Sequence, residues 1–271
     1  DLHAQRGVEG VDRAVALGQI ANSPYALSDH LAVQVTVDPD HRGRGRGSTM
    51  LGLVESEAIG RGFRGLVATI PEAASGPQAW AEARGFQRHA LRCDSLLDLR
   101  TFDGQSAVRA GVTLSDMTGA SEAQWKAVAM LLQTLIADAP DMRDLPSWTL
   151  ARCFSVLRET PASRPEWVVV AGFNGRPVGL TIGHALGQEI YSYFTGVLPD
   201  WRGRHVGLAL KLRLIAAAQM SGITTMRTTN LDANTAALRL NASIGFRRVP
   251  GSLEVRKALS AVDFATSANP R

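Results

Sequence analysis

The chain repeats one segment of its own sequence at an offset of 160 residues, from Val37 to Val197. The first copy, Val37–Gly47, reads VDPDHRGRGRG, the second, Val197–Gly207, reads VLPDWRGRHVG, and seven of the eleven positions are identical. The same offset carries Gly85-Phe86 onto Gly245-Phe246. An internal repeat of this kind predicts two structural units of one type, and it constrains the fold more than any single motif does.

Each copy is predicted to run from a strand into an Arg/Gly loop and then into a helix. His30–Val37 and Ile190–Val197 are rich in β-branched and aromatic residues, and a proline ends each of them. Apolar residues then recur at helical spacing. They are Met50, Leu51, Leu53, Val54 and Ile59 in the first copy and Leu208, Leu210, Leu212, Leu214 and Ile215 in the second. Each loop therefore stands at a helix N-terminus, where free N–H groups and the helix dipole attract anions.

The composition of the loops suits a pyrophosphate. Gly43, Gly45 and Gly47 let the backbone approach a ligand without a Cβ in the way. The arginines add long-range attraction and bidentate hydrogen bonds. Neither G-x-x-x-x-G-K-[ST] nor G-x-G-x-x-G occurs here, so a Walker loop and a dinucleotide fingerprint are not met. A surface turn is the alternative for one copy, but two copies at equal spacing disfavour it.

These residues resemble the GNAT superfamily of N-acyltransferases, whose signature is a strand, then V-x-P-x-x-R-G-x-G-x-[GA], then a helix, with a later helix that ends in Gly-Phe. The matching residues are Arg42, Gly45 and Gly47 in the first copy and Arg202 and Gly207 in the second. His205 stands where the middle glycine is expected. The resemblance is to the tandem two-domain type, which includes mycothiol synthase and N-acyltransferases of actinobacterial antibiotic pathways.

The resemblance implies that acetyl-CoA or another acyl-CoA is the co-substrate. Its pyrophosphate would lie at the two helix N-termini, its pantetheine arm would pair with strands that splay from their neighbours, and an asparagine-bearing helix would line the thiol end. The residues assigned to this role are Val37, Arg42, Gly43, Arg44, Gly45, Arg46, Gly47, Ser48, Val197, Arg202, Gly203, Arg204, His205, Val206, Gly207, Leu208, Asn230, Asn234 and Asn241. No metal ligands are assigned.

The resemblance also implies an α/β fold class with two tandem GNAT domains, each a mixed, mostly antiparallel sheet flanked by helices. We assign residues 1–105 to the first domain and 106–271 to the second. By the offset, residue 1 corresponds to Pro161, so the first domain keeps a strand at Ala14–Ala21 and everything after it but lacks a first strand and two helices. We therefore expect the native gene to encode several tens of residues before Asp1.

The second copy can be read in full. Its predicted helices are Glu122–Ala137 and Trp148–Leu157, and Asn174-Gly175 predicts a hairpin. Its predicted strands are Val112–Leu114, Trp167–Ala171, Val178–Ile182, Ile190–Val197, Thr224–Asn230 and Phe246–Lys257, the last of which would close the sheet.

Acyl transfer to an amine needs a base for the ammonium, donors for the thioester oxygen and an acid for the leaving thiolate. GNAT enzymes often use a tyrosine on the helix before Gly-Phe as the acid. Asn241 stands there in the second copy and Ala81 in the first, and neither can serve.

Substitutes for the acid and base lie on the strands of the second copy. Tyr191, Tyr193 and Thr195 alternate, which predicts that they share one face. Tyr193 and His184 are our candidate catalytic residues, with Glu189 expected close to His184. A packed aromatic and a satisfied histidine are the competing interpretations. Because the second copy has these residues and the asparagine pattern, we favour catalysis there and a retained cofactor or structural role for the first.

The leading interpretation is an acyl-CoA N-acyltransferase that moves an acetyl or longer acyl group to the amine of a small molecule such as an amino sugar, an amino acid or an antibiotic-like acceptor. The alternative is a non-catalytic acyl-CoA-binding sensor or scaffold.

The net charge of only +4, with arginines in loops, makes nucleic acid a minor option as a partner. No apolar run long enough for a membrane span occurs. Two lone cysteines, Cys93 and Cys153, suit a reduced, cytoplasmic protein. Acceptor and oligomeric state stay open.

Overall fold

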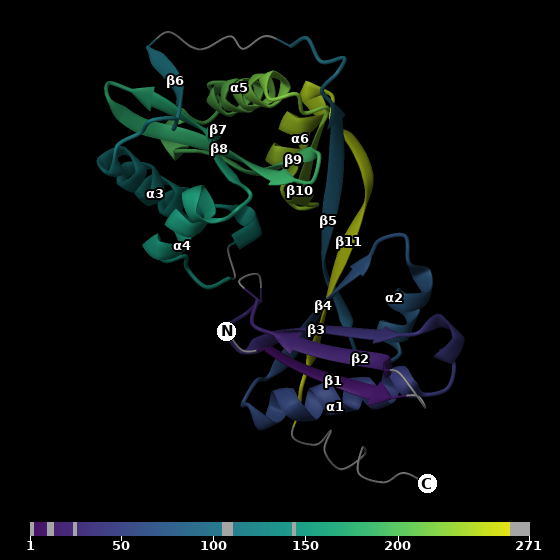
Figure 1. The fold of residues 1–271 in the computed structure, drawn as a ribbon. Helices are drawn as coiled ribbons and strands as arrows, with labels where there is room; N and C mark the ends of the chain where they lie inside the picture. The colour runs from purple at the N-terminus through teal and green to yellow at the C-terminus, as the bar shows by residue number, and fades with distance from the viewer. Residues whose placement is uncertain (1–2, 10–13, 24–25, 105–110, 143–144, 261–271) are drawn as a thin grey trace. The chain divides into compact units, whose positions relative to one another are not determined.

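The computed structural model describes residues 3–9, 14–23, 26–104, 111–142 and 145–260 (Figure 1). They form two compact units. Unit 1 contains the described residues up to Arg92, residues 145–146 and those from Gly251 onward. Unit 2 contains residues from Cys93 to 142 and Ser147–Pro250. No helix in the described part of the chain is long and apolar enough to cross a membrane.

Unit 1 is a mixed sheet with one long helix on one face. Its elements are β1 (His3–Glu9), β2 (Ala14–Ala21), β3 (His30–Val37), α1 (Arg46–Gly60), β4 (Gly65–Pro71), α2 (Ser75–Glu82), the first part of β5 (Gln87–Asp98) and most of β11 (Arg247–Ala258). The strand order is β1-β2-β3-β4-β11-β5. Leu51 and Val54 of α1 pack against Leu31, Leu66 and other apolar side chains of the sheet. Among the described residues, unit 1 has no counterpart of β6, α3 and α4 of unit 2.

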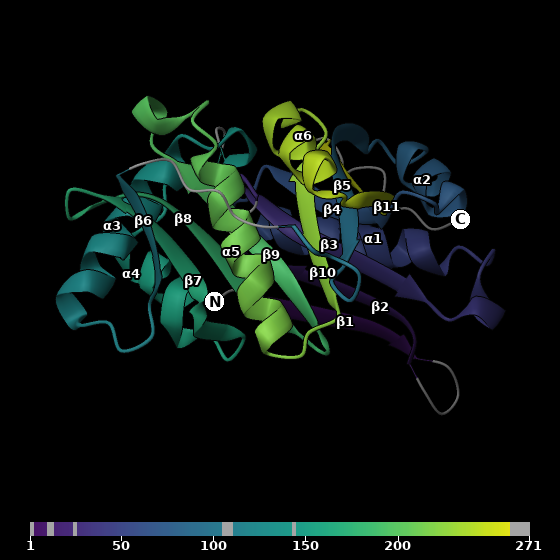
Figure 2. The same cartoon turned by 90° about the horizontal axis from the view of Figure 1, so that it is seen from above.

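Unit 2 is a sheet covered on both faces (Figure 2). Its further elements are β6 (Val112–Asp116), α3 (Glu122–Ala137), α4 (Leu150–Phe154) with a π-turn at Ser155–Glu159, β7 (Ser163–Phe173), β8 (Arg176–Leu186), β9 (Glu189–Val197), α5 (Val206–Met220), β10 (Thr225–Leu231) and α6 (Thr235–Ile244). The strand order is β5-β10-β9-β8-β7-β6. Alternate residues of β7 belong to two clusters: Val169 packs with α5, and Val168 and Val170 pack with α3. The two helical layers therefore lie on opposite faces of the sheet.

Local sequence signals explain the elements that were predicted correctly. The Ser121 hydroxyl accepts from the Gln124 N–H while the Gln124 side chain accepts from the Ser121 N–H, and this capping box fixes the start of α3 at Glu122 as predicted. Asn174 and Gly175 both have positive φ, 48° and 75°, which suits the predicted two-residue hairpin between β7 and β8. The second predicted helix is shorter, because α4 passes into the π-turn after Phe154.

The prediction that the last strand closes the sheet of the second copy is wrong. β11 pairs antiparallel with β4 from Ser252↔Pro71 to Ala258↔Gly65, inside unit 1. Leu253 and Val255 enter the core of unit 1, and Lys257 donates to Glu55 of α1 at 2.7 Å. β5 instead takes the place beside β10 in unit 2. Each unit thus receives its last strand from the other repeat.

The compact units therefore do not follow the division at residues 105 and 106. That division stays a prediction about the two repeats, while the units follow strand pairing. β1 was not predicted, because its sequence, HAQRGVE, contains a single β-branched residue. The polar residues 101–109, which link the two repeats in the sequence, lie partly outside the described residues.

Candidate functional site

In both units the strand before the Arg/Gly loop separates from its parallel neighbour. β3 pairs with β4 from His30↔Gly65 to Ala32↔Val67, and the described ladder goes no further. In unit 2 the described ladder between β9 and β10 consists of Met226↔Ile190 and Arg227↔Tyr191. The remaining residues of β3 and β9 therefore diverge from β4 and β10. We call these divergences the unit 1 fork and the unit 2 fork.

Each Arg/Gly loop lies directly before a long helix and has the same backbone shape. In unit 1 the N-cap of α1 is Gly45, with φ 78°, and in unit 2 the N-cap of α5 is His205, with φ 60°. Gly45 has no side chain to cap its helix, and within the described part of the chain the His205 side chain makes no capping hydrogen bond. The first N–H groups of both helices are therefore left to a ligand or to water. Histidine holds a left-handed conformation here at a cost of about 1–2 kcal/mol, so the loop keeps its shape although the glycine is missing.

One arginine anchors each loop to the strand before it. Arg42 Nε donates to the Val37 carbonyl at 3.1 Å, and Arg202 Nε donates to the Val197 carbonyl at 3.2 Å. The other loop residues are mostly exposed: Gly43, Arg44, Gly45 and Ser48 in unit 1 and Gly203, Arg204 and His205 in unit 2. Arg46, Gly47, Gly207 and Leu208 are half-buried and Val206 is buried. The predicted cofactor residues of each loop are thus brought together at one helix N-terminus, with backbone N–H groups and guanidinium groups that fit a diphosphate.

The two helix starts differ in what surrounds them. In unit 1 Arg84 lies over the Trp80 ring and donates to Ser48 Oγ at 2.7 Å. A Cβ at Gly47 would lie 3.2 Å from the Trp80 ring. In unit 2 a Cβ at Gly207 would lie 3.7 Å from Val197 and 3.8 Å from Leu240, which is ordinary contact. A side chain at Gly207 is therefore accommodated more easily than one at Gly47.

Two aspartates tie the segment after α3 to this part of unit 2. Asp138 forms an ion pair with Arg202. Asp141 Oδ1 accepts from Asn234 Nδ2 at 2.9 Å. The Asp138 carboxylate is thus paired with the Arg202 guanidinium, the group that we expected to bind a phosphate.

The three predicted asparagines hold β10 and α6 together. Asn234 caps α6 by accepting from the Ala237 N–H at 3.2 Å. Asn241 is buried, and its Nδ2 donates to Asn230 Oδ1 at 2.8 Å. These contacts hold Asn230 of β10 next to α6, the helix that we expected beside the thiol end of the cofactor. Their contact with a cofactor stays a prediction.

A β-bulge in β9 changes the expected arrangement of its polar side chains. The register with β8 passes from Ile182↔Phe194 to Gly183↔Ser192, so Tyr193 is the extra residue. Tyr193 and Phe194, adjacent in sequence, consequently pack against the same cluster, on the α3 face. The prediction that Tyr191, Tyr193 and Thr195 share one face is therefore wrong for Thr195, while the Tyr191 and Tyr193 rings remain neighbours with centroids 6.2 Å apart.

Thr195 points to the other side of the sheet. Its hydroxyl lies 2.7 Å from the Thr181 hydroxyl. Thr181 lies between Leu180 and Ile182, both of which belong to the cluster on the α3 face, so Thr181 faces α5. The bulge is the physical reason, because one extra residue reverses the alternation that follows it.

The structure places His184 and Tyr193 together. Their ring centroids are 4.6 Å apart. His184 is buried, and its Nε2 lies 2.8 Å from the Val156 carbonyl in the π-turn. A carbonyl only accepts, so Nε2 carries the hydrogen and Nδ1 keeps the lone pair. Burial lowers the pKa of His184, which favours this neutral form.

Glu189, which we expected beside His184, has another partner. In the ladder it lies opposite Leu186, and His184 lies opposite Tyr191. Glu189 Oε2 accepts from Arg227 Nε at 3.2 Å. The relay between Glu189 and His184 is therefore not supported by the observed geometry.

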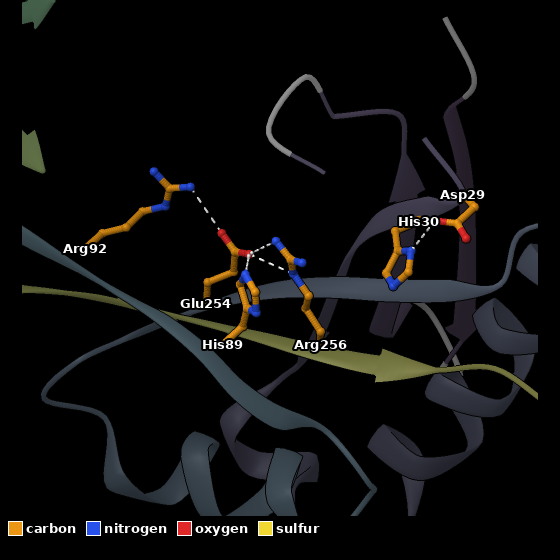
Figure 3. Close-up of polar contacts among 6 residues, drawn as sticks. All are labelled: Asp29, His30, His89, Arg92, Glu254 and Arg256. Atoms are coloured by element: carbon orange, nitrogen blue, oxygen red, sulfur yellow. Dashed lines mark hydrogen bonds and ion pairs between the residues drawn. The ribbon is translucent and has the colours of Figure 1, made fainter. Parts of the chain in front are cut away.

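Unit 1 contains a polar cluster of a different kind (Figure 3). Glu254 of β11 is 4% exposed, and its carboxylate accepts from Arg92 at 3.1 Å and from Arg256 at 2.8 Å. His89 lies 4.0 Å away. A buried carboxylate needs such partners. Since the guanidinium groups compensate its charge, we assign the cluster to holding β11 next to β5.

Comparisons with known proteins agree with this geometry. Residues 149–230 match the family described as "Acetyltransferase (GNAT) domain". The chain is 30% identical over 140 residues to the L-2,4-diaminobutyric acid acetyltransferase of Nocardia farcinica, covering 47% of this chain and 72% of that protein. It is 27% identical over 237 residues to the mycothiol acetyltransferase of Stackebrandtia nassauensis, covering 84% and 74%. A tandem GNAT protein from the clavulanic acid biosynthesis pathway superposes with a TM-score of 0.71 at 21% identity, over 95% of this chain and 84% of that one.

Proposed function

The chain belongs to the GNAT acetyltransferases, which use acetyl-CoA as co-substrate, and we propose that unit 2 transfers the acetyl group to the primary amine of a small molecule. The observation that carries this assignment is that unit 2 combines a helix N-terminus without a side-chain cap, a fork and the bulged Tyr193 beside His184. The ladder between β2 and β3 in unit 1 runs without a bulge from Ala16↔Val37 to Ala21↔Ala32. By this register Val33 stands where unit 2 has Ser192, and the bulged Tyr193 has no counterpart in the described β3.

The residues of unit 2 fit a diphosphate followed by an extended amide-bearing arm. The first N–H groups of α5 and Arg202 would hold the diphosphate. The diverging edge of β9 between Val197 and Ser192 would offer backbone donors and acceptors to the amides of pantetheine. The thioester would then lie toward the closed end of the fork, near Tyr193. The unit 1 loop would keep a cofactor or structural role.

Tyr193 and His184 would then divide the proton transfers. The lone pair on His184 Nδ1 would accept a proton from the ammonium of the acceptor, directly or through one water. The Tyr193 hydroxyl would donate to the departing thiolate. The bulge supports this role because it turns Tyr193 out of the regular ladder at the second residue of the fork.

The names of two relatives, a diaminobutyric acid acetyltransferase and a mycothiol acetyltransferase, support a small-molecule acceptor. We propose an amino acid, an amino sugar or an antibiotic-like amine. The test is release of CoA thiol from acetyl-CoA in the presence of 2,4-diaminobutyrate, an amino sugar and a set of aminoglycosides. We expect turnover with at least one of these amines. Tight acetyl-CoA binding with no turnover on any of them would favour the alternative of a non-catalytic sensor.

Asp138→Asn is expected to raise the affinity for acetyl-CoA. The Asp138 carboxylate pairs with Arg202, so a diphosphate must displace it. Both side chains are about half exposed, and exposed pairs contribute up to about 1 kcal/mol, which corresponds to a gain of up to about fivefold. Calorimetry measures the change. Asp200→Asn removes an equal charge near the same loop and serves as the control. Equal gains for both variants would show a general charge effect and contradict the competition.

A further inference from the structure

A lysine is buried inside unit 2. Lys211 of α5 is 4% exposed, within a helix whose other inward-facing residues are apolar. Its Nζ donates to Ser192 Oγ at 2.8 Å and lies 5.4 Å from the centroid of the Phe246 ring. Burial lowers the pKa of Lys211 to about 7. Removing an ammonium from water is costly, so its place in the core calls for a reason beyond packing.

The partner of Lys211 lies at the branch point of the unit 2 fork. The last ladder pair between β9 and β10 is Tyr191↔Arg227, and Ser192 is the next residue. The Thr228 hydroxyl donates to the Ser192 carbonyl at 3.0 Å. Ser192 is therefore held twice, through its side chain by Lys211 and through its backbone by Thr228. The residue that follows it is the bulged Tyr193.

Unit 1 shows that packing alone does not require these polar groups. By strand register and helix position, Leu51, Val33 and Ala68 stand in unit 1 where unit 2 has Lys211, Ser192 and Thr228. Leu51 is buried in the core of unit 1 as Lys211 is in unit 2. The polar set and the bulge occur together in unit 2, and both are missing from the described β3 of unit 1. The polar residues and the bulge are therefore both present in unit 2, and unit 1 has apolar residues and a regular ladder instead.

We propose that Lys211, acting through Ser192 and with Thr228, is a positioning group that holds the bulged Tyr193–Phe194 segment at the fork in the geometry that acetyl transfer needs. The proposal rests on the proposed function of unit 2. Since Tyr193 is the extra residue of the bulge, the backbone of this segment depends on the residues that flank it as well as on the contacts of the Tyr193 ring. Lys211 and Thr228 fix the flanking residue from the α5 layer and from β10. A small displacement of a reacting group costs rate more than it costs binding.

The test uses Lys211→Met, which places an apolar side chain of similar length where unit 1 has leucine. We expect kcat to fall about tenfold or more, because misplacement by about 1 Å can cost about a hundredfold. We expect the Kd for acetyl-CoA to stay within twofold and the melting temperature not to fall, because an apolar replacement of a buried charge is usually tolerated. Leu51→Met in unit 1 is the matched control and should leave kcat unchanged.

Ser192→Ala and the double variant test whether Lys211 acts through Ser192. If it does, the double variant should be no slower than the slower single variant, because both changes break one chain of contacts. Multiplied losses, or an unchanged kcat in Lys211→Met, would overturn the proposal. Arg202 and Tyr193 variants that remain impaired in the same assay would show that the proposed function survives this failure.

A second measurement does not need an acceptor. Amide hydrogen exchange at Tyr193 and Phe194 should become faster in Lys211→Met and stay unchanged in Leu51→Met. If the wild-type protein acetylates no amine, the proposed function fails, and this exchange still decides the role of Lys211. Unchanged exchange at both amides would overturn that role.

Discussion

Tyr193→Phe is expected to lower kcat by about 10²–10⁴-fold, the range typical for loss of a general acid. The change removes only the hydroxyl, so the ring keeps its stacking on His184 and its contacts with the cluster on the α3 face. The KM for acetyl-CoA should change little, since the proposed diphosphate site lies at the other end of β9. Steady-state kinetics of thiol release measures both parameters.

Tyr191→Phe is the matched control for this prediction. Tyr191 lies on the same strand, and its ring contacts the Tyr193 ring edge to face. Tyr191→Phe also removes only a hydroxyl, but from a residue that pairs in the ladder with β10. A full loss in Tyr193→Phe and a small one in Tyr191→Phe would support the assignment. A fully active Tyr193→Phe together with an inactive Arg42→Ala would reverse it and make unit 1 the catalytic one.

Gly207→Glu is expected to weaken acetyl-CoA binding by about a hundredfold or more, since juxtaposed like charges cost several kcal/mol. The space around Gly207 accepts a Cβ at ordinary contact distance. A glutamate in the first turn also suits the helix dipole, so the fold should persist. The carboxylate would, however, lie where the N–H groups of α5 meet the diphosphate. Calorimetry with acetyl-CoA gives the affinity, and the melting temperature confirms folding.

Gly207→Ala separates the charge from the added carbon and should cost little affinity. Gly47→Glu makes the equivalent change in unit 1. If Gly207→Glu binds normally and Gly47→Glu does not, the principal acetyl-CoA site lies in unit 1. Loss in both variants would indicate two sites, which the stoichiometry of the calorimetric titration would show directly.

The repeat predicted much of the fold because it carries local signals twice. The prolines at strand ends and the Asn174-Gly175 hairpin act over a few residues, and the structure ends β3 and β9 and turns from β7 to β8 where the sequence indicated. The family and its co-substrate were also predicted from these loops. The shape of the loops depends on a left-handed residue at the helix N-cap, and His205 adopts that conformation as Gly45 does.

The rest depends on contacts between distant residues. The alternation of side chains in the sequence cannot reveal the bulge at Tyr193, because a strand with a bulge and a strand without one can have the same alternating sequence. The partner of β11 is set by Glu55, Arg92 and the core of unit 1, which lie far away in sequence. Lys211 carried one available signal: it is a lysine within the apolar run LALKLRL of a predicted helix. Its partner Ser192 could not be inferred without the register of β9.

The route of β11 also sets the order in which the chain can be completed on the ribosome. Residues 252–258 emerge after all of unit 2, yet they supply the strand that pairs with β4. Until then β4, with the sequence GLVATIP, has an open hydrogen-bonding edge, and such edges promote association between chains. The unit begun first is therefore finished last, and a nascent chain stalled before residue 252 would carry an unfinished sheet.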